Sequence, residues 1–139
     1  FFFHFNMDLS NGPCVAKRLS GCGAGHEYFA VAENGDLYPC HQFVGRKRYK
    51  LGSIYDGVTD EELPPYFRES HVLNKEKCAD CWARFFCSGG CHANADLFHG
   101  DIRKPYEVGC EIQKKRLECA LYVQALLALE KEEQVQAAL

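Results

Sequence analysis

The sequence has no excess of positive charge, no long apolar run and no internal repeat. Its 139 residues carry a formal net charge of −3, which argues against a nucleic-acid-binding surface, because such surfaces usually show a basic excess. No apolar run approaches the roughly 18 residues needed to cross a bilayer. A Ser/His/Asp set and a glycine-rich phosphate loop are also missing. What remains is a chain long enough for one domain with a modest core.

The first residues are typical of the interior of a longer chain. Residues 1–5 have neither an initiator Met nor the basic region and small-residue cleavage site of a signal peptide. We therefore expect a cut made inside a longer protein. Polar and apolar residues alternate from His4 to Leu9, which predicts a half-buried strand within residues 1–10. We expect this strand to continue from a missing N-terminal domain.

Nine cysteines dominate the composition, and three kinds of chemistry compete to explain them. Disulfides suit small secreted domains, but the number is odd and nothing marks secretion. A structural zinc ion takes four Cys or His ligands, and an iron–sulfur cluster typically takes four Cys thiolates. The spacing favours iron–sulfur clusters over zinc, and zinc over disulfides. The nine are Cys14, Cys22, Cys40, Cys78, Cys81, Cys87, Cys91, Cys110 and Cys119.

Four of these cysteines form one dense motif, Cys78-x2-Cys81-x5-Cys87-x3-Cys91. The glycines between the last two predict a tight turn whose backbone N–H groups point at sulfur, and such hydrogen bonds tune a cluster's potential. The same four thiols fit a zinc knuckle, but one zinc ion leaves four further cysteines unused. The last pair also matches the first half of C-x3-C-x2-C, the cluster motif of radical S-adenosylmethionine (SAM) enzymes. The third position of that motif is Asn94, so this chain does not generate the radical by itself.

A β-hairpin is predicted where Asn34-Gly35 joins two strand-like runs, 27–32 and 36–40. With these two residues as a type I′ turn, Phe29 lies opposite Cys40. Pairing should end near Cys40, because the preceding proline cannot donate to a strand ladder. The thiol then leaves the hairpin at a strand end, in a loop.

Further along the chain, one strand and two helices are predicted. Residues 49–55 form a short strand, and residues 59–62 resemble a capping box that opens a helix near Pro65. From about Glu111 the composition turns to good helix formers, which predicts a long terminal helix. Candidates for its buried side are Ile112, Leu117, Leu121 and Leu127.

The cysteine pattern resembles the seven-cysteine signature of the SPASM domain, the C-terminal extension of many radical SAM peptide-modifying enzymes. The signature reads Cys22-x12-Gly35-x4-Cys40, a gap, Cys78-x2-Cys81-x5-Cys87-x3-Cys91, a gap, and Cys110. More narrowly, four segments resemble the maturases of SCIFF peptides (six cysteines in forty-five residues), which install thioether links from peptide cysteines to other residues. The segments are Gly12-Pro13-Cys14, Gly21-Cys22-Gly23-Ala24-Gly25, Tyr38-Pro39-Cys40-His41-Gln42-Phe43-Val44-Gly45 and Cys81-Trp82-Ala83-Arg84.

The resemblance implies a small α+β fold over residues 11–139, with short β-hairpins, cysteine-rich cluster-binding loops and a C-terminal α-helix. It also implies two auxiliary [4Fe–4S] clusters whose ligands cross between the two halves of the chain. The second cluster takes Cys78, Cys81, Cys87 and Cys110. The first cluster takes Cys22, Cys40 and Cys91.

The fourth ligand of the first cluster stays open at this point. Either Cys14 completes the site, or the iron is left free for a substrate cysteine thiolate. Cys119 belongs to neither set, because a free cysteine is more often a small buried apolar residue than a ligand. His41 and His92 each follow a ligand cysteine. They either donate hydrogen bonds to cluster sulfur or substrate, or are ordinary surface or loop histidines, and we expect the latter.

The resemblance further implies a division of labour within a cytoplasmic enzyme. The missing N-terminal radical SAM domain holds S-adenosylmethionine and a third cluster, and abstracts a hydrogen from a cysteine-rich precursor peptide. The present domain anchors that peptide, and it ligates the peptide's thiol or accepts an electron. We expect neither a nucleic acid nor a membrane as a partner. Two alternatives remain: the SPASM domain of another radical SAM maturase, such as an anaerobic sulfatase maturase, and a non-enzymatic structural zinc module. Zinc can also replace iron in protein prepared in air.

Overall fold

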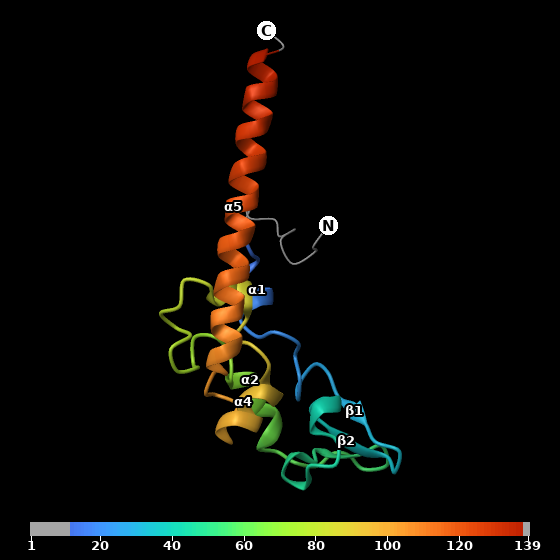
Figure 1. The fold of residues 1–139 in the computed structure, drawn as a ribbon. Helices are drawn as coiled ribbons and strands as arrows, with labels where there is room; N and C mark the ends of the chain where they lie inside the picture. The colour runs from blue at the N-terminus through green and yellow to red at the C-terminus, as the bar shows by residue number, and fades with distance from the viewer. Residues whose placement is uncertain (1–11, 138–139) are drawn as a thin grey trace.

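A computed structural model describes residues 12–137 of the chain, and the expected small α+β fold with a long C-terminal helix is confirmed (Figure 1). The strand predicted within residues 1–10 lies outside the described residues. In chain order the elements are α1 (Val15–Arg18), β1 (Ala30–Val31), β2 (Asp36–Tyr38), the 3-10 helices η2 (His41–Phe43) and η3 (Lys47–Tyr49), β3 (Gly52–Ser53), β4 (Gly57–Val58), α2 (Leu63–Glu69), α3 (Arg84–Cys87), α4 (His92–His99) and α5 (Glu107–Ala137).

The four strands form one antiparallel sheet in the order β1-β2-β3-β4. In the first hairpin Val31 lies opposite Leu37, and Ala30 lies opposite Tyr38. The predicted strand over residues 49–55 is shorter than expected, because η3 covers its start and β3 is only two residues long.

The turn of the first hairpin is one residue longer than predicted. The backbone N–H of Ala32 donates to the carbonyl oxygen of Asp36 at 2.8 Å, which leaves a three-residue loop between them. Gly35 is the one residue of this loop with a positive φ, 86°, whereas a type I′ turn needs two. The register therefore shifts by one residue, and the predicted pairing of Phe29 with Cys40 is wrong.

Helix α2 begins at Leu63, two residues before the predicted Pro65, and both prolines of this segment lie in its first turn. The side chain of Asp60 accepts hydrogen bonds from backbone N–H groups at the start of the helix. Its Oδ1 accepts the backbone N–H groups of Glu62 at 3.0 Å and of Leu63 at 2.8 Å. A side chain that occupies these free N–H groups stabilises the helix start.

Helix α5 begins at Glu107, earlier than predicted, and its C-terminal part extends away from the other described elements (Figure 1). Leu117 is buried as expected, and Ala120 is buried beside it. The other three residues predicted to be buried are exposed, namely Ile112, Leu121 and Leu127. Within residues 12–137 no helix has both the length and the apolarity to cross a membrane.

The hydrophobic core joins the sheet to the helices through three aromatic rings. Phe43, Tyr49 and Phe67 are at most 2% exposed, and their ring centroids lie 4.5 to 6.0 Å apart. Tilted and edge-to-face pairs of this kind add to the stability gained from burial. Cys40 belongs to the same core, so one predicted metal ligand is held against buried apolar side chains.

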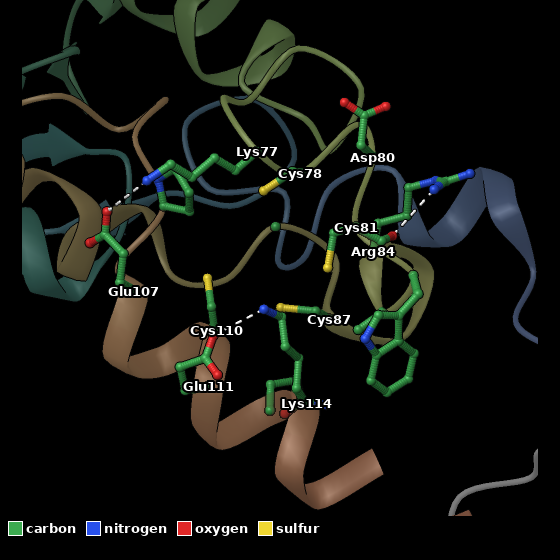
Figure 2. A pocket seen from close by; sticks show the side chains of 15 residues that line it. Lys77, Cys78, Asp80, Cys81, Arg84, Cys87, Glu107, Cys110, Glu111 and Lys114 are labelled. Atoms are coloured by element: carbon green, nitrogen blue, oxygen red, sulfur yellow. Dashed lines mark hydrogen bonds and ion pairs between the residues drawn. The ribbon is translucent and has the colours of Figure 1, made fainter. Parts of the chain in front are cut away.

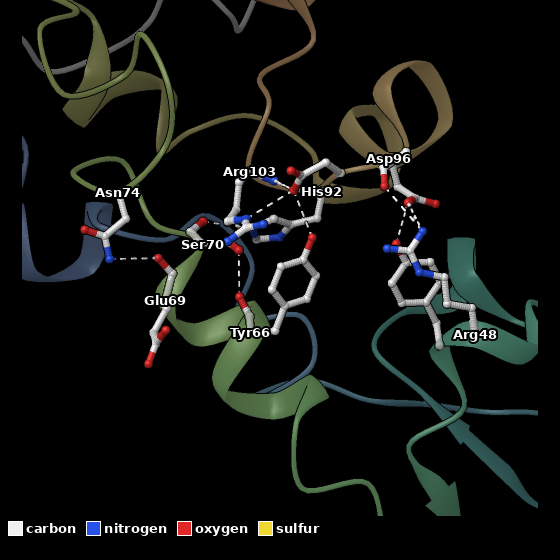
Figure 3. Close-up of polar contacts among 11 residues, drawn as sticks. Arg48, Tyr66, Glu69, Ser70, Asn74, His92, Asp96 and Arg103 are labelled. Carbon is white, nitrogen blue, oxygen red and sulfur yellow. Dashed lines mark hydrogen bonds and ion pairs between the residues drawn. The ribbon is translucent and has the colours of Figure 1, made fainter.

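A polar clamp on Asp96 of α4 ties this helix to η3 (Figure 3). Arg46 Nη1 donates to Asp96 Oδ2 at 2.8 Å, and the hydroxyl of Tyr49 donates to Oδ1. Arg48 Nη1 lies 3.9 Å from the same Oδ1. The clamp fixes the middle of α4 relative to η3.

Candidate metal centre

Four cysteines line one cavity of about 550 Å³. They come from three segments of the chain, and Figure 2 shows their sulfur atoms around a shared space. We call these four the pocket group: Cys78, Cys81, Cys87 and Cys110. They are the residues that the family resemblance implies as ligands of the second cluster.

Local backbone structure places each thiol of the pocket group. The N–H of Cys81 donates to the carbonyl oxygen of Cys78 at 3.1 Å, which holds both in one turn. Cys87 is the last residue of α3. The N–H of Cys110 donates to the carbonyl oxygen of Tyr106 at 3.1 Å, so this thiol projects from the first turn of α5. Three separate segments thus converge on the cavity.

The thiols of the pocket group influence one another electrostatically. Burial raises the pKa of the Cys78 thiol to about 11, Lys75 opposes this rise, and the other three thiols of the group add to it. Burial likewise raises the pKa of Cys110, with Cys87 and Cys81 as further causes. Protons leave such thiols when a metal binds, because thiolates are the ligands.

The pocket group brings four thiols to one cavity. They line it together with charged and apolar side chains, among them Lys77, Trp82 and Arg84. Within residues 12–137, no group of three or more His, Cys, Asp or Glu side chains is close enough together to hold a metal ion as the side chains stand. Four thiols around one cavity match the usual donor set of a [4Fe–4S] cluster.

A second set of three thiols, the surface group, lies near the pocket group, because Cys91 lines a smaller cavity together with Cys87 and Cys110. It consists of Cys22, Cys40 and Cys91. Cys40 is 8% exposed, whereas Cys22 and Cys91 are exposed. Burial raises the pKa of Cys40, and the nearby thiols of Cys22 and Cys91 raise it further.

The backbone brings the three segments of the surface group together. The N–H of Gly25 donates to the carbonyl oxygen of Pro39 at 3.1 Å, which sets the loop after Cys22 beside Cys40. A Cβ added at Gly21 would lie 3.7 Å from the carbonyl oxygen of Ser88, so the chain before Cys22 runs past the loop that leads to Cys91.

One short loop connects the two groups. It runs from Cys87, in the pocket group, to Cys91, which precedes α4. Its three inner residues all have positive φ: 59° at Ser88, 79° at Gly89 and 71° at Gly90. Glycines adopt this conformation at little cost, which allows the chain to reverse between the two sites.

Lys75 is the residue near both groups that sequence reasoning missed. Its side chain is 2% exposed, and its Nζ donates to the carbonyl oxygen of Gly89 at 2.9 Å. In the sequence it stands in a charged run with Glu76 and Lys77, which is typical of a solvated loop. No pattern in the sequence distinguishes the buried lysine from its exposed neighbour.

Two cysteines belong to neither group. Cys14 is exposed directly before α1. Cys119 lies on α5 nine residues after Cys110, which is about 13 Å along a helix axis.

The two histidines that follow ligand cysteines differ. His41 is exposed, as expected, but His92 is only 4% exposed. Its Nε2 lies 3.1 Å from the carbonyl oxygen of Ser70 (Figure 3), and its ring packs edge-on against Phe67. The expectation that His92 is an ordinary surface or loop histidine is therefore wrong.

Comparison with models of protein families gives no match. A curated protein of Archaeoglobus fulgidus, described as an uncharacterized protein, is similar to this chain. The two are 32% identical over 101 residues, which make up 70% of this chain and 24% of the archaeal protein. The chain thus spans about a quarter of the length of the curated relative that it matches.

Proposed function

We propose that this chain is a SPASM-type domain that binds two auxiliary [4Fe–4S] clusters in a radical SAM enzyme. The parent enzyme, in this proposal, is a cytoplasmic maturase that forms thioether cross-links in a cysteine-rich ribosomal peptide. The domain that binds S-adenosylmethionine and a third cluster lies outside this chain. The substrate is the precursor peptide, and neither a nucleic acid nor a membrane is a partner.

The observation that carries the proposal is the cavity lined by Cys78, Cys81, Cys87 and Cys110. Cys78 is buried and the other three are half-buried, and free thiols around an open volume gain little from packing, because a void has no atoms to contact. A bound cluster removes this cost and keeps the sulfurs as thiolates. The linkage makes cluster binding part of the folding free energy of this region.

The surface group supplies the second site. Three thiols are present, two of them exposed, so a thiol from a bound peptide has access to the same place. The Asp96 clamp contacts the helix that follows Cys91, and Cys40 belongs to the aromatic core, so protein contacts help to hold both segments in position. When bound, a cluster supplies electron transfer and a Lewis-acidic iron at this site. The protein positions the three thiols, and the buried surroundings of Cys40 exclude water from one side of the site.

Anaerobic reconstitution with iron and sulfide tests this proposal. About eight irons per chain are expected for two clusters, with Mössbauer spectra of the [4Fe–4S] type. Cys81→Ala should lower the count by about half, because it removes one of four ligands. Cys119→Ala is the matched control and should leave the count unchanged. A chain that binds only tetrahedral zinc under these conditions would overturn the proposal in favour of a structural zinc module.

The same measurement on Cys14→Ala decides the open ligand of the first cluster. An unchanged iron count means that Cys14 is dispensable and that the iron is free for a substrate thiolate. Loss of about four irons makes Cys14 the fourth ligand.

A further inference from the structure

Lys75 is a buried lysine between the segments that carry the two thiol groups. The backbone carbonyl oxygen of Lys75 accepts the N–H of Cys78 at 3.1 Å, which places Lys75 at the start of the pocket-group turn. Its Nζ reaches the carbonyl oxygen of Gly89, in the loop that leads to the surface group. A Cβ added at Gly89 would lie 3.3 Å from Lys75 Cδ, so the side chain packs directly against this loop. Lys75 thus bridges the segments that carry both sites.

The charge of Lys75 has no carboxylate partner within the described part of the chain. Each of the ion pairs found there uses another cation. A cation that is 2% exposed is costly unless an anion or several acceptors compensate it. Its one recorded hydrogen bond leaves two of the three ammonium donors for other acceptors.

Cysteines are the groups whose charge acts on Lys75. The thiols close enough to interact with it electrostatically belong to both groups. They are Cys78, Cys87, Cys91 and Cys22. Thiolates bound to a cluster carry negative charge at neutral pH, whereas free buried thiols are protonated. The loaded chain therefore contains the counter-charge that the buried lysine needs.

We propose that Lys75 is a positive charge shared by both clusters, which stabilises the added electron on each and raises both reduction potentials. This inference rests on the proposed function, because it presupposes that both thiol groups hold clusters. Reduction adds one negative charge to a cluster, and a cation in a low-dielectric interior stabilises that charge more than an exposed one does.

Lys114 offers a natural comparison. It acts on Cys81 and Cys110 of the pocket group and is paired with Glu111 at 2.9 Å. Its side chain is 34% exposed, so solvent screens its charge. We therefore expect the charge of Lys114 to raise the reduction potential of one cluster slightly, whereas the charge of Lys75 raises the potentials of both.

The test is a redox titration of the reconstituted whole chain, with dithionite as reductant and electron paramagnetic resonance as readout. In Lys75→Gln the ratio of reduced to oxidised cluster at a fixed potential should fall about tenfold for both clusters, or about 59 mV for a one-electron couple. Lys75→Arg, which keeps the charge, should stay close to the wild type. Lys114→Gln should shift one cluster only, and by less.

The outcomes separate this inference from the proposed function. If the wild type fails to bind two clusters, the proposed function itself fails. If Lys75→Gln holds about eight irons and either cluster keeps its wild-type potential, the shared charge is overturned. If Lys75→Gln binds less iron than the wild type, the iron count of Lys75→Arg is compared. A wild-type iron count in Lys75→Arg supports the need for a positive charge at this position, and a lowered iron count in both variants overturns it.

Discussion

Cys87 and Cys91 stand at the two ends of one glycine loop, yet their thiols belong to different groups. Cys87 lines the cavity of about 550 Å³ with Cys78, Cys81 and Cys110, and Cys91 lies near Cys40. Cys87, Cys91 and Cys110 also line a second cavity of about 160 Å³. The positive φ angles of the loop between them reverse the chain within three residues. A disturbance of this loop should therefore reach both sites.

Gly89→Ala tests the loop. Gly89 has a φ of 79°, and an added Cβ would lie 3.3 Å from Lys75 Cδ. Gly45 has a φ of 81° with no atom within 4 Å of an added Cβ. Gly45→Ala therefore has a similar backbone strain but no steric contact with a neighbouring side chain. We expect Gly89→Ala to lower the free energy of unfolding by about 1–3 kcal/mol more than Gly45→Ala. Urea unfolding of both variants checks this, and equal losses would contradict it.

Asp96→Ala tests the clamp between α4 and η3. The substitution removes the acceptor of the Tyr49 hydroxyl, whose residue is 2% exposed, and the partner of Arg46. We expect a loss of about 1–3 kcal/mol in the free energy of unfolding, since a buried donor is left without an acceptor. Glu118→Ala breaks an exposed pair with Lys115 and should cost less than about 1 kcal/mol. A similar loss in the two variants would argue against the clamp.

The fold class could be anticipated from the sequence, but the exact register of the hairpin could not. Asn34 and Gly35 located the turn of the hairpin correctly. A two-residue and a three-residue loop both suit this sequence, and the choice depends on which residues take positive φ. Only Gly35 does so, which moves Cys40 by one position relative to its expected neighbour.

Burial was harder to anticipate than secondary structure. Leu121 and Leu127 are good helix formers, and they do lie in α5. They are exposed because this part of the helix extends away from the described domain (Figure 1). Conversely, Lys75 has the sequence surroundings of a solvated loop but is buried, since Gly89 provides an acceptor fourteen residues away in sequence.

Stability should fall in acid because of His92. Burial lowers the pKa of His92 from 6.5 to about 4, so the folded chain keeps this ring neutral while the unfolded chain takes up a proton. The stability gained is present above pH 6.5 and is lost as the pH falls towards about 4. Between about pH 7 and about pH 5, the free energy of unfolding measured with urea should fall less in His92→Gln than in the wild type. The exposed His41→Gln should match the wild type, and an unchanged loss in His92→Gln would refute this role.

Stability of the metal-free chain should also fall in alkali. Burial raises the pKa of the Cys78 thiol from 9.0 to about 11, so the folded chain holds this proton more tightly than the unfolded chain does. The resulting stability is present below pH 9 and is lost as the pH rises towards about 11. Urea unfolding at about pH 8 and about pH 10.5 should show less alkaline loss in Cys78→Ala than in Cys119→Ala. Equal losses would mean that Cys78 is not the responsible group.

The most direct test of the account is whether Cys87 and Cys91 serve different clusters. Cys87→Ala, Cys91→Ala and the double variant are reconstituted anaerobically, and iron is counted. We predict that each single variant loses about four irons per chain and that the double variant loses about eight, because each thiol belongs to a separate four-iron site. If the double variant loses no more iron than either single variant, the two thiols share one site and the account of two groups joined by one loop is wrong.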